Sequence, residues 1–326
     1  MLKHEQLLKV DDLKVHFYTP DGVIKAVENV AFSIKVGEIF GLIGESGCGK
    51  STVGLTILRL LPLNAAVKGG SIFFRNLDLL KIPEEGMCKI RGKEISMIFQ
   101  DPATSLNPLF TVGKQLSDVI KAHSNIKEDK ELKNISLEIL KEVALPNPEK
   151  VYDMFPHELS GGMQQRVAIA IALSTKPKLL IADEPTTMLD VSIQAQILDL
   201  LLGLKKKLNL SMLFITHNFG IAAEVCDRLA VMYAGTIVEE GYVEQIFESP
   251  LHPYTCGLLK AVPKIAKEKS YLTCIPGDVP SLLNPPTGCK FHTRCQYATS
   301  KCKIESPRSI EIEYGHKVAC YRYADH

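Results

Sequence analysis

The sequence predicts an α/β protein with a parallel sheet covered by helices on both faces. From Ser160 to about residue 234, short apolar runs alternate with helix-forming segments, and strands separated by helices pair in parallel. Near residue 44, a glycine-rich loop joins a short apolar run to another helix-forming segment. Hydrophobic residues make up 46% of the 326 residues and charged residues 23%, which excludes a disordered chain. This length suggests about two domains.

The first third of the chain is predicted to begin with three strands. They are Leu7–Tyr18, the alternating segment Val27–Val36 and the short apolar run Glu38–Ile43, which ends at Gly44. A helix is expected over Lys50–Leu61, where Pro62 ends it.

Residues 102–158 are expected to form a helical insertion. Helical segments lie around Val112–Ala122 and Glu131–Val143, and Pro-containing turns separate them. The β/α alternation then returns, with helices at 163–173, 193–208 and near 220–225, and strands at 178–182, 211–215 and 229–234. The tail from Ser249 is rich in Pro and Cys and has little periodicity.

Charge and hydropathy restrict the possible partners. Lys and Arg number 38 against 37 Asp and Glu, so no overall basic field predicts nucleic-acid binding. The only short basic run, Lys205–Lys207, ends a predicted helix and complements its dipole. We find no uninterrupted run of 18 apolar residues and no apolar N-terminal leader, so we expect a cytosolic chain with reduced thiols.

The strongest motif is a phosphate-binding loop. Gly44 to Thr52 read Gly-Glu-Ser-Gly-Cys-Gly-Lys-Ser-Thr and fit G-x-x-x-x-G-K-S/T between a predicted strand and helix. Lys50 is expected to reach the β- and γ-phosphates and Ser51 to hold Mg²⁺. The nucleotide-binding residues of this motif are Gly44, Ser46, Gly47, Gly49, Lys50, Ser51 and Thr52. A plain glycine-rich turn is the alternative, and Cys48 is interpreted as a variable position rather than a redox switch.

Two carboxylates follow a buried strand. Leu179-Leu-Ile-Ala-Asp183-Glu184 places Asp183 where it could organise Mg²⁺ and Glu184 where it could act as general base on the attacking water. The alternative is a structural cap on the next segment.

A third motif is Leu159-Ser-Gly-Gly-Met-Gln-Gln-Arg166. Ser160, Gly161 and Gly162 open a predicted helix and offer a hydroxyl and free N–H groups to an anion. A simple N-cap is the alternative.

The order of these motifs resembles the ABC transporter ATPase family, over residues 7–250. The resemblance implies an ABC-type P-loop NTPase core, with an antiparallel β-subdomain and a helical subdomain, that uses ATP and Mg²⁺. It also implies that Gln100 is the Q-loop residue and a Mg²⁺ ligand, that Asp190 is the D-loop aspartate and that His217 contacts the γ-phosphate. Phe17 (or Tyr18) stands where the family stacks an aromatic ring on adenine. Met188 departs from the usual Ala of the D-loop.

Members of this family pair head to tail. The resemblance therefore implies that Ser160, Gly161 and Gly162 contact a partner's ATP, while Lys50 and the carboxylates act on this chain's own ATP. ATP would close the dimer and hydrolysis would reopen it.

Three further segments resemble the dipeptide/oligopeptide importer ATPases: Phe99–Pro108, Ser249–Thr255 and the stretch from Ile275 to Cys289. This implies a second ATPase subunit (hetero- or homodimer), two transmembrane permease subunits docking near Gln100 and, indirectly, an extracytoplasmic peptide-binding protein. The chain would be peripheral at the cytoplasmic face of the membrane. Two alternatives stay open: import of nickel or another small solute, and a soluble non-transport ABC ATPase.

Cysteines concentrate in the tail, where six of the nine follow residue 250. Cys289, Cys295, Cys302 and Cys320 have the spacing C-x₅-C-x₆-C-x₁₇-C, and flanking cationic residues are expected to favour thiolates. Zinc usually takes closer cysteine pairs, whereas four cysteines can hold a 4Fe-4S cluster, and the resembled subgroup includes members with such a cluster. Zinc and free thiols are the alternatives. We expect an ATPase domain at 1–250, with its helical subdomain at about 102–160, and a Cys-rich extension at 251–326.

Overall fold

The computed structural model describes residues 5–261 and 275–323. The chain divides into two compact units. The first consists of Met1–Lys81 with Phe214–His326, and the second consists of Ile82–Leu213.

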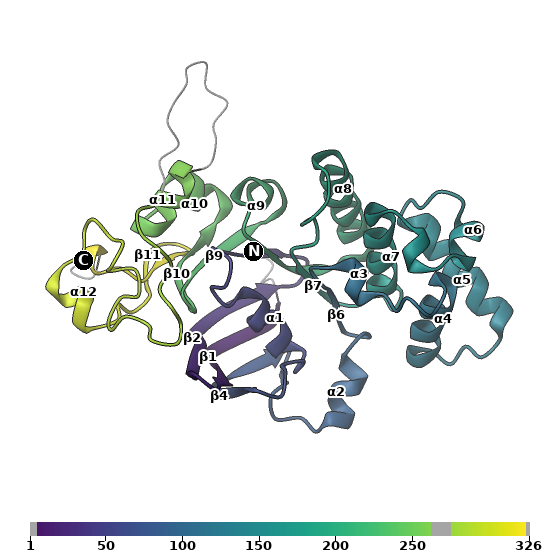
Figure 1. The fold of residues 1–326 in the computed structure, drawn as a ribbon, viewed down its shortest axis with the longest axis horizontal. Coiled ribbons are helices and arrows are strands. Elements are labelled where there is room, and N and C mark those ends of the chain that lie inside the picture. The colour runs from purple at the N-terminus through teal and green to yellow at the C-terminus, as the bar shows by residue number, and fades with distance from the viewer. Residues whose placement is uncertain (1–4, 262–274, 324–326) are drawn as a thin grey trace, which may run out of the picture. The chain divides into compact units, whose positions relative to one another are not determined.

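The first unit contains an antiparallel sheet. Its strand order is β2-β1-β4-β5, and β2, β1 and β4 lie side by side in Figure 1. Their bounds are β1 (Gln6–Thr19), β2 (Gly22–Lys35), β4 (Ala65–Phe74) and β5 (Leu77–Asp78). Alternate apolar side chains of β1, such as Leu13 and Val15, are fully buried, as expected where one face of a sheet covers a core. The sequence predicted β1 and β2 but not β4 or β5.

The same unit contains a mixed set of strands. β3 (Ile39–Ile43) pairs in parallel with β9 (Arg228–Tyr233), and every residue of both strands is buried. β9 then pairs antiparallel with β10 (Thr236–Tyr242). Beyond β10 lie β12 (His316–Val318) and β11 (Ile310–Glu313). The tail therefore contributes two strands that the sequence did not predict.

Helix α1 (Lys50–Ile57) follows β3 and is shorter than expected. The prediction extended it to Leu61 because Pro62 stops a helix. The helix ends earlier, because Leu58 is its C-cap and Arg59 has a left-handed backbone with φ 53°. The other helices of this unit are α9 (Phe219–Val225), α10 (Val243–Glu248), α11 (Pro253–Ala261) and α12 (Ser300–Ile304).

The second unit combines a parallel strand pair with a group of helices. β6 (Ile95–Ile98) pairs in parallel with β7 (Leu179–Asp183), and both strands are buried. Four of its helices pack on one another: α4 (Val112–His123), α5 (Asp129–Glu142), α6 (Pro148–Asp153) and α7 (Gly161–Leu173) (Figure 1). The remaining helices are α2 (Glu84–Ile90), α3 (Pro102–Ser105) and α8 (Val191–Leu208). Strand β8 (Ser211–Thr216) contains the boundary between the units.

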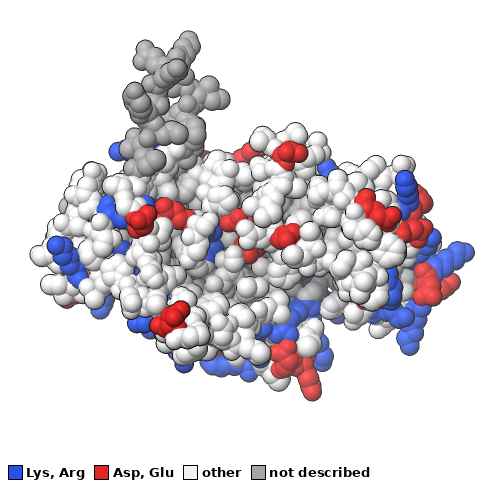
Figure 2. All heavy atoms as spheres, in the orientation of Figure 1, with Lys and Arg blue, Asp and Glu red and all other residues white. Residues whose placement is uncertain are grey.

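The surface has no single dominant sign on the face drawn in Figure 2, where basic and acidic side chains are interspersed among uncharged residues. This agrees with the formal net charge of +1. Within residues 5–261 and 275–323, we find no helix that combines the length and the apolar character needed to cross a bilayer.

Candidate active site

The predicted phosphate loop begins directly after β3 and ends where α1 begins at Lys50. Two of its glycines cannot be replaced without strain, because of their backbone conformation or because neighbouring atoms leave no room for a Cβ. Gly49 has φ 104°, and a Cβ there would lie 2.4 Å from the carbonyl oxygen of Ala26. A Cβ on Gly44 would lie 2.1 Å from the carbonyl oxygen of Met232. Side chains at both positions are therefore excluded by backbone atoms, which cannot move aside cheaply.

Lys50 is held inside this loop. Its Nζ donates to the carbonyl oxygens of Gly44 at 2.8 Å and Glu45 at 3.0 Å, and the residue is 4% exposed. Cys48 lies beside it, with Sγ 3.8 Å from Nζ. Burial raises the pKa of the Cys48 thiol above its ordinary value despite the nearby ammonium group. The thiol is therefore neutral, so it is not the reactive thiolate that a redox switch needs.

The other loop residues are more accessible. Ser46 and Gly47 are exposed, and Ser51 and Thr52 are half-buried in the first turn of α1. The backbone N–H groups of Ser51 and Thr52 lie at the start of α1, where they can donate to phosphate oxygens.

The remaining predicted residues of the first unit lie at strand ends. Phe17 is half-buried near the end of β1, and the neighbouring Tyr18 is exposed with Lys68 Nζ 5.1 Å from its ring centroid. His217 is exposed and directly follows β8. Asn218 then caps α9, since its Oδ1 accepts the N–H of Gly220 at 2.9 Å.

The two carboxylates of the second unit are nearly buried at the end of β7. Asp183 is 4% exposed and Glu184 is 8% exposed. Glu184 Oε2 accepts the hydroxyl of Thr187 at 2.9 Å and the Nε2 amide of Gln100 at 3.2 Å. Gln100 follows β6, the strand parallel to β7, so the ends of these two strands bring together residues that are 84 positions apart. Glu184 also has a left-handed backbone with φ 46°, which turns the chain at this point.

Two glutamines that the sequence analysis did not single out fix the loop after Glu184. Gln165 is 1% exposed and its Nε2 donates to the carbonyl oxygen of Pro185 at 2.7 Å. Gln194 Nε2 donates to the carbonyls of Thr186 at 3.0 Å and Leu189 at 3.1 Å. The only signal for Gln165 was its place inside the Leu159–Arg166 motif.

Ser160 opens α7 as its N-cap, with Oγ accepting the N–H of Met163 at 3.4 Å. Ser160 and Gly161 are exposed, and a Cβ on Gly161 would approach nothing closer than Leu189 at 3.8 Å. Asp190, which precedes α8, is also exposed and makes no capping hydrogen bond with its side chain. Met188 is 81% exposed with φ 66°. This edge of the second unit therefore presents polar groups and small residues to its surroundings.

Cys289, Cys295, Cys302 and Cys320 line a single pocket in the first unit, and the N–H of Cys289 donates to the carbonyl oxygen of Cys302 at 2.8 Å. Burial raises the pKa of Cys289 to about 11 and also raises the pKa values of Cys295 and Cys320. The expectation that flanking cations favour thiolates is therefore wrong for these three, because burial outweighs the charges. In the part of the chain that the structure describes, we find no group of three or more His, Cys, Asp or Glu placed to hold a metal ion.

A glycine-rich loop that opens a helix and buried Asp and Glu residues at a strand end define a P-loop nucleotide-binding protein. The family described as ABC transporter matches residues 27–187, and the oligopeptide/dipeptide transporter C-terminal region matches residues 238–302. The second match includes Cys289, Cys295 and Cys302 but ends before Cys320.

Similar proteins extend over nearly the whole chain. A probable peptide ABC transporter ATP-binding protein of Sinorhizobium fredii is 47% identical over 98% of this chain and 96% of its own length. The dipeptide transport ATP-binding protein DppD of Escherichia coli is 44% identical over 97% of this chain and 96% of its own. The dimeric, ADP- and Pi-bound structure of the ATP-binding cassette MJ0796 has a TM-score of 0.66 at 28% identity, covering 72% of this chain and 98% of that chain. The chain belongs to the ABC transporter ATP-binding proteins of the dipeptide/oligopeptide importer family.

Proposed function

We propose that this chain is the ATP-hydrolysing subunit that powers import of dipeptides or oligopeptides through a membrane ABC transporter. The observation that carries the proposal is similarity over 97–98% of the chain to peptide-transport ATP-binding proteins, including the C-terminal region. We place the ATPase domain at residues 1–250, with its helical subdomain at about 102–160, and the Cys-rich extension at 251–326.

ATP binding is assigned to the phosphate loop. Lys50 contacts the β- and γ-phosphates, while Ser46, Thr52 and the loop glycines donate to phosphate oxygens. Phe17 stacks on adenine. The hydroxyl of Ser51, the amide oxygen of Gln100 and the carboxylate of Asp183 are oxygen donors of the kind that Mg²⁺ prefers.

Hydrolysis is assigned to Glu184 with Gln100 and His217. Glu184 takes a proton from water while the water oxygen attacks the γ-phosphorus and the bond to the β–γ bridging oxygen breaks, releasing ADP and phosphate. The two hydrogen bonds that Glu184 accepts support this role, since they orient a nearly buried carboxylate. His217 contacts the γ-phosphate.

A second ATPase subunit, identical or different, completes each ATP site. Ser160, Gly161, Gly162 and Asp190 contact the partner's nucleotide. The exposure of Ser160, Gly161 and Asp190 supports this, because groups that serve a partner must be reachable from outside the chain.

Two transmembrane permease subunits dock on the second unit, which places the chain at the cytoplasmic face of the membrane. A groove in this unit supports the docking. It is lined in part by Met97, Phe99 and Leu106, and Phe99 is 41% exposed. Met97 and Leu106 are buried, so Phe99 is the apolar side chain among these three that a partner could contact. An extracytoplasmic binding protein and the permeases select the cargo, so the ATPase subunit does not itself determine it. Nickel or another small solute is therefore the alternative cargo. A soluble non-transport ABC ATPase is the other alternative.

We further propose that the four tail cysteines hold a 4Fe-4S cluster. Such a cluster gives each cysteine its own iron, so its thiolates stand farther apart than the ligands of one zinc ion. The four cysteines line one pocket, and four thiolates are the ligand set that such a cluster takes. Anaerobically purified protein should absorb near about 400 nm with about four irons per chain. Cys320→Ser should lose both signals, whereas Cys88→Ser, at an exposed cysteine of the other unit, should keep them. Colourless, iron-free wild-type protein would contradict the cluster.

The function is tested by uptake of labelled dipeptides and longer peptides into cells that carry the wild type, Glu184→Gln or the control Glu138→Gln. Glu138 is exposed on α5. We expect Glu184→Gln to abolish uptake while ATP binding persists, and Glu138→Gln to behave as the wild type. Unchanged peptide uptake with Glu184→Gln would overturn the assignment to peptide import.

A further inference from the structure

We propose that Arg294 is a positioning residue for the phosphate loop, so that the cysteine segment (residues 289–295) helps to set the affinity for ATP. This inference rests on the proposed ATPase function. It concerns residues of the first unit only, since the phosphate loop and the cysteine segment both belong to that unit.

Arg294 contacts the loop through two nitrogens. Its Nη1 lies 3.0 Å from Glu45 Oε2 and its Nη2 lies 3.4 Å from Glu45 Oε1. The Arg294 side chain is 5% exposed and that of Glu45 is 27% exposed, so water screens this ion pair in part. Two-point contacts between a guanidinium and a carboxylate are strong and fix orientation. Glu45 is the second residue of the phosphate loop, 249 positions away in sequence.

The Glu45 contacts reach the nucleotide-binding lysine. The carbonyl oxygen of Glu45 accepts from Lys50 Nζ at 3.0 Å. The N–H of Glu45 donates to the hydroxyl of Tyr254 at 3.2 Å, and that hydroxyl donates to Glu45 Oε2 at 3.2 Å. Side chain and backbone of Glu45 are therefore both fixed from outside the loop. Loss of the Arg294 contact would leave Glu45 held from outside the loop by Tyr254, and would loosen the Glu45 carbonyl that accepts from Lys50 Nζ.

The cysteine segment is packed firmly enough to transmit this constraint. The ring of Phe291 lies 5.2 Å from Tyr233 and 5.4 Å from Tyr254, centroid to centroid. Lys290 Nζ donates to the carbonyl oxygen of Ala234 at 2.7 Å. The next residue, Gly235, donates its N–H to the carbonyl oxygen of Cys48 in the loop at 2.9 Å. Because Cys289 and Cys295 bound this segment, a rearrangement of the cysteine pocket would also move Arg294.

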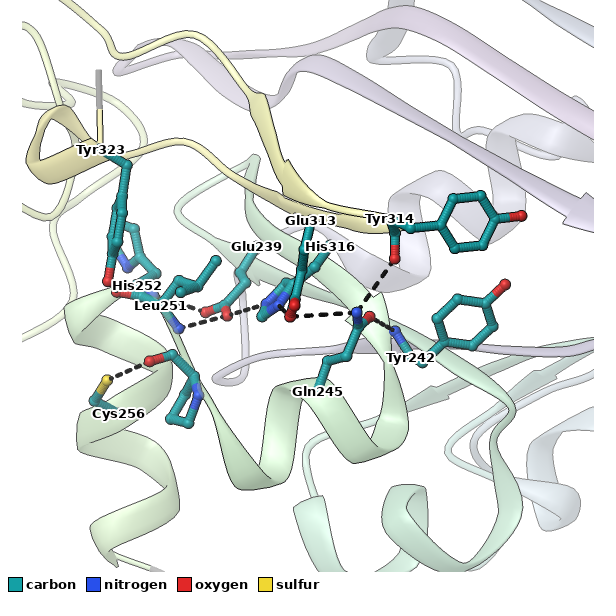
Figure 3. Close-up of polar contacts among 11 residues, drawn as sticks. Glu239, Tyr242, Gln245, Leu251, His252, Cys256, Glu313, Tyr314, His316 and Tyr323 are labelled. Atoms are coloured by element: carbon teal, nitrogen blue, oxygen red, sulfur yellow. Dashed lines mark hydrogen bonds and ion pairs between the residues drawn. The ribbon is translucent and has the colours of Figure 1, made fainter. Parts of the chain in front are cut away.

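Tyr254 is held independently of Arg294. Glu239 accepts the N–H groups of Leu251 at 2.7 Å and His252 at 2.9 Å, and His316 Nε2 lies 2.9 Å from its Oε1 (Figure 3). Figure 3 shows Glu239 between the start of α11 and the C-terminal strands. This network anchors the segment that carries Tyr254. A substitution at Arg294 should therefore loosen Glu45 without undocking the whole extension.

The test uses the full-length chain in its transporter complex, with the variants Arg294→Gln, Arg294→Lys and Tyr254→Phe. Arg308→Gln is the matched control, because Arg308 is an exposed arginine of the same extension. The measurements are the ATP concentration dependence of hydrolysis, direct binding of ATP and the melting temperature. Loss of this part-buried, charge-assisted contact should raise the KM and Kd for ATP by about 10-fold in Arg294→Gln, with turnover at saturating ATP unchanged. Arg294→Lys should recover part of the affinity, and Tyr254→Phe should weaken binding in the same direction.

A double-mutant cycle decides whether the effect passes through Glu45. The Kd for ATP of Glu45→Gln with Arg294→Gln should be no higher than that of the more affected single variant. If Arg294→Gln lowers only the melting temperature, or if its effect adds fully to that of Glu45→Gln, the positioning role is wrong. A wild-type complex without ATPase activity would instead contradict the proposed function, and the direct binding measurement keeps these two failures distinct.

Discussion

His252 makes the stability of the first unit sensitive to acid. The residue is 1% exposed, and its Nδ1 accepts the N–H of Tyr254 at 3.1 Å. Burial lowers the pKa of His252 to about 4, although the nearby Glu239 acts in the opposite direction. The imidazole is therefore neutral in the folded protein at neutral pH, and its Nδ1 is an acceptor.

The size of the effect follows from proton linkage. In the unfolded chain the pKa of histidine is about 6.5, so the unfolded state takes up a proton at a higher pH than the folded state. The stability contribution is complete above about pH 6.5 and is lost as the pH falls from there toward about 4. With a pKa of about 4 in the folded protein, a difference of about 2.5 units corresponds to about 3 kcal/mol, of which about 2 kcal/mol is lost by about pH 5.

The assay is urea unfolding of the full-length chain and of His252→Asn at several pH values. Asn keeps an acceptor oxygen close to the position of Nδ1 but does not titrate. Any cavity left by the smaller side chain costs the same free energy at every pH, so it drops out of the comparison. The difference in unfolding free energy between the two proteins should shift by about 2 kcal/mol in favour of the variant between about pH 7.5 and about pH 5. His157→Asn, at an exposed histidine of the other unit, is measured beside it as the matched control. A pH-independent difference for His252→Asn would refute the reasoning.

Gly49→Ala should abolish ATP binding measured by nucleotide titration, because its Cβ would lie 2.4 Å from a carbonyl oxygen, and retained binding would contradict this. Gly161→Ala should keep the melting temperature, because its Cβ would approach nothing in its own chain closer than 3.8 Å. It should lose ATPase activity in the complex, because under the proposed function the partner's nucleotide lies against this residue. Burial alone would lower the pKa of His316, but hydrogen bonds with Glu239 and Glu313 raise it. Its stability contribution is thus present below about pH 6.5 and is lost as the pH rises through the raised pKa, so His316→Gln should flatten the alkaline side of the pH–stability curve. Iodoacetamide followed by mass spectrometry should label the exposed Cys88 in the native protein and spare the buried Cys48.

Local motifs in the sequence predicted the phosphate loop because its requirements lie within nine consecutive residues. The apolar run of β3, the glycines and the start of α1 are contiguous, and each is recognisable by its composition. The same holds for the apolar β7 that precedes Asp183 and Glu184. Short strands such as β5 and β11 were missed, because two to four residues are too few to display a periodicity.

Contacts between distant residues could not be predicted from the sequence. The hydrogen bond from Gln100 to Glu184 depends on β6 and β7 being parallel neighbours. The sequence predicted that flanking cations would favour thiolates in the tail, and this prediction was wrong because it too depended on contacts between distant residues. Flanking charges can be counted in a sequence, but the burial that outweighs them is produced by packing from elsewhere in the unit.

The glycines of the Gly44–Thr52 and Leu159–Arg166 motifs differ in what surrounds them. At Gly44 and Gly49, backbone oxygens of the same chain exclude a side chain, so packing within the unit already requires glycine there. At Gly161, the first residue of α7, the chain leaves room for a side chain, since a Cβ would approach nothing closer than Leu189 at 3.8 Å. Packing within the unit therefore does not require glycine at this position, and a loss of activity in Gly161→Ala would report a contact made from outside the chain.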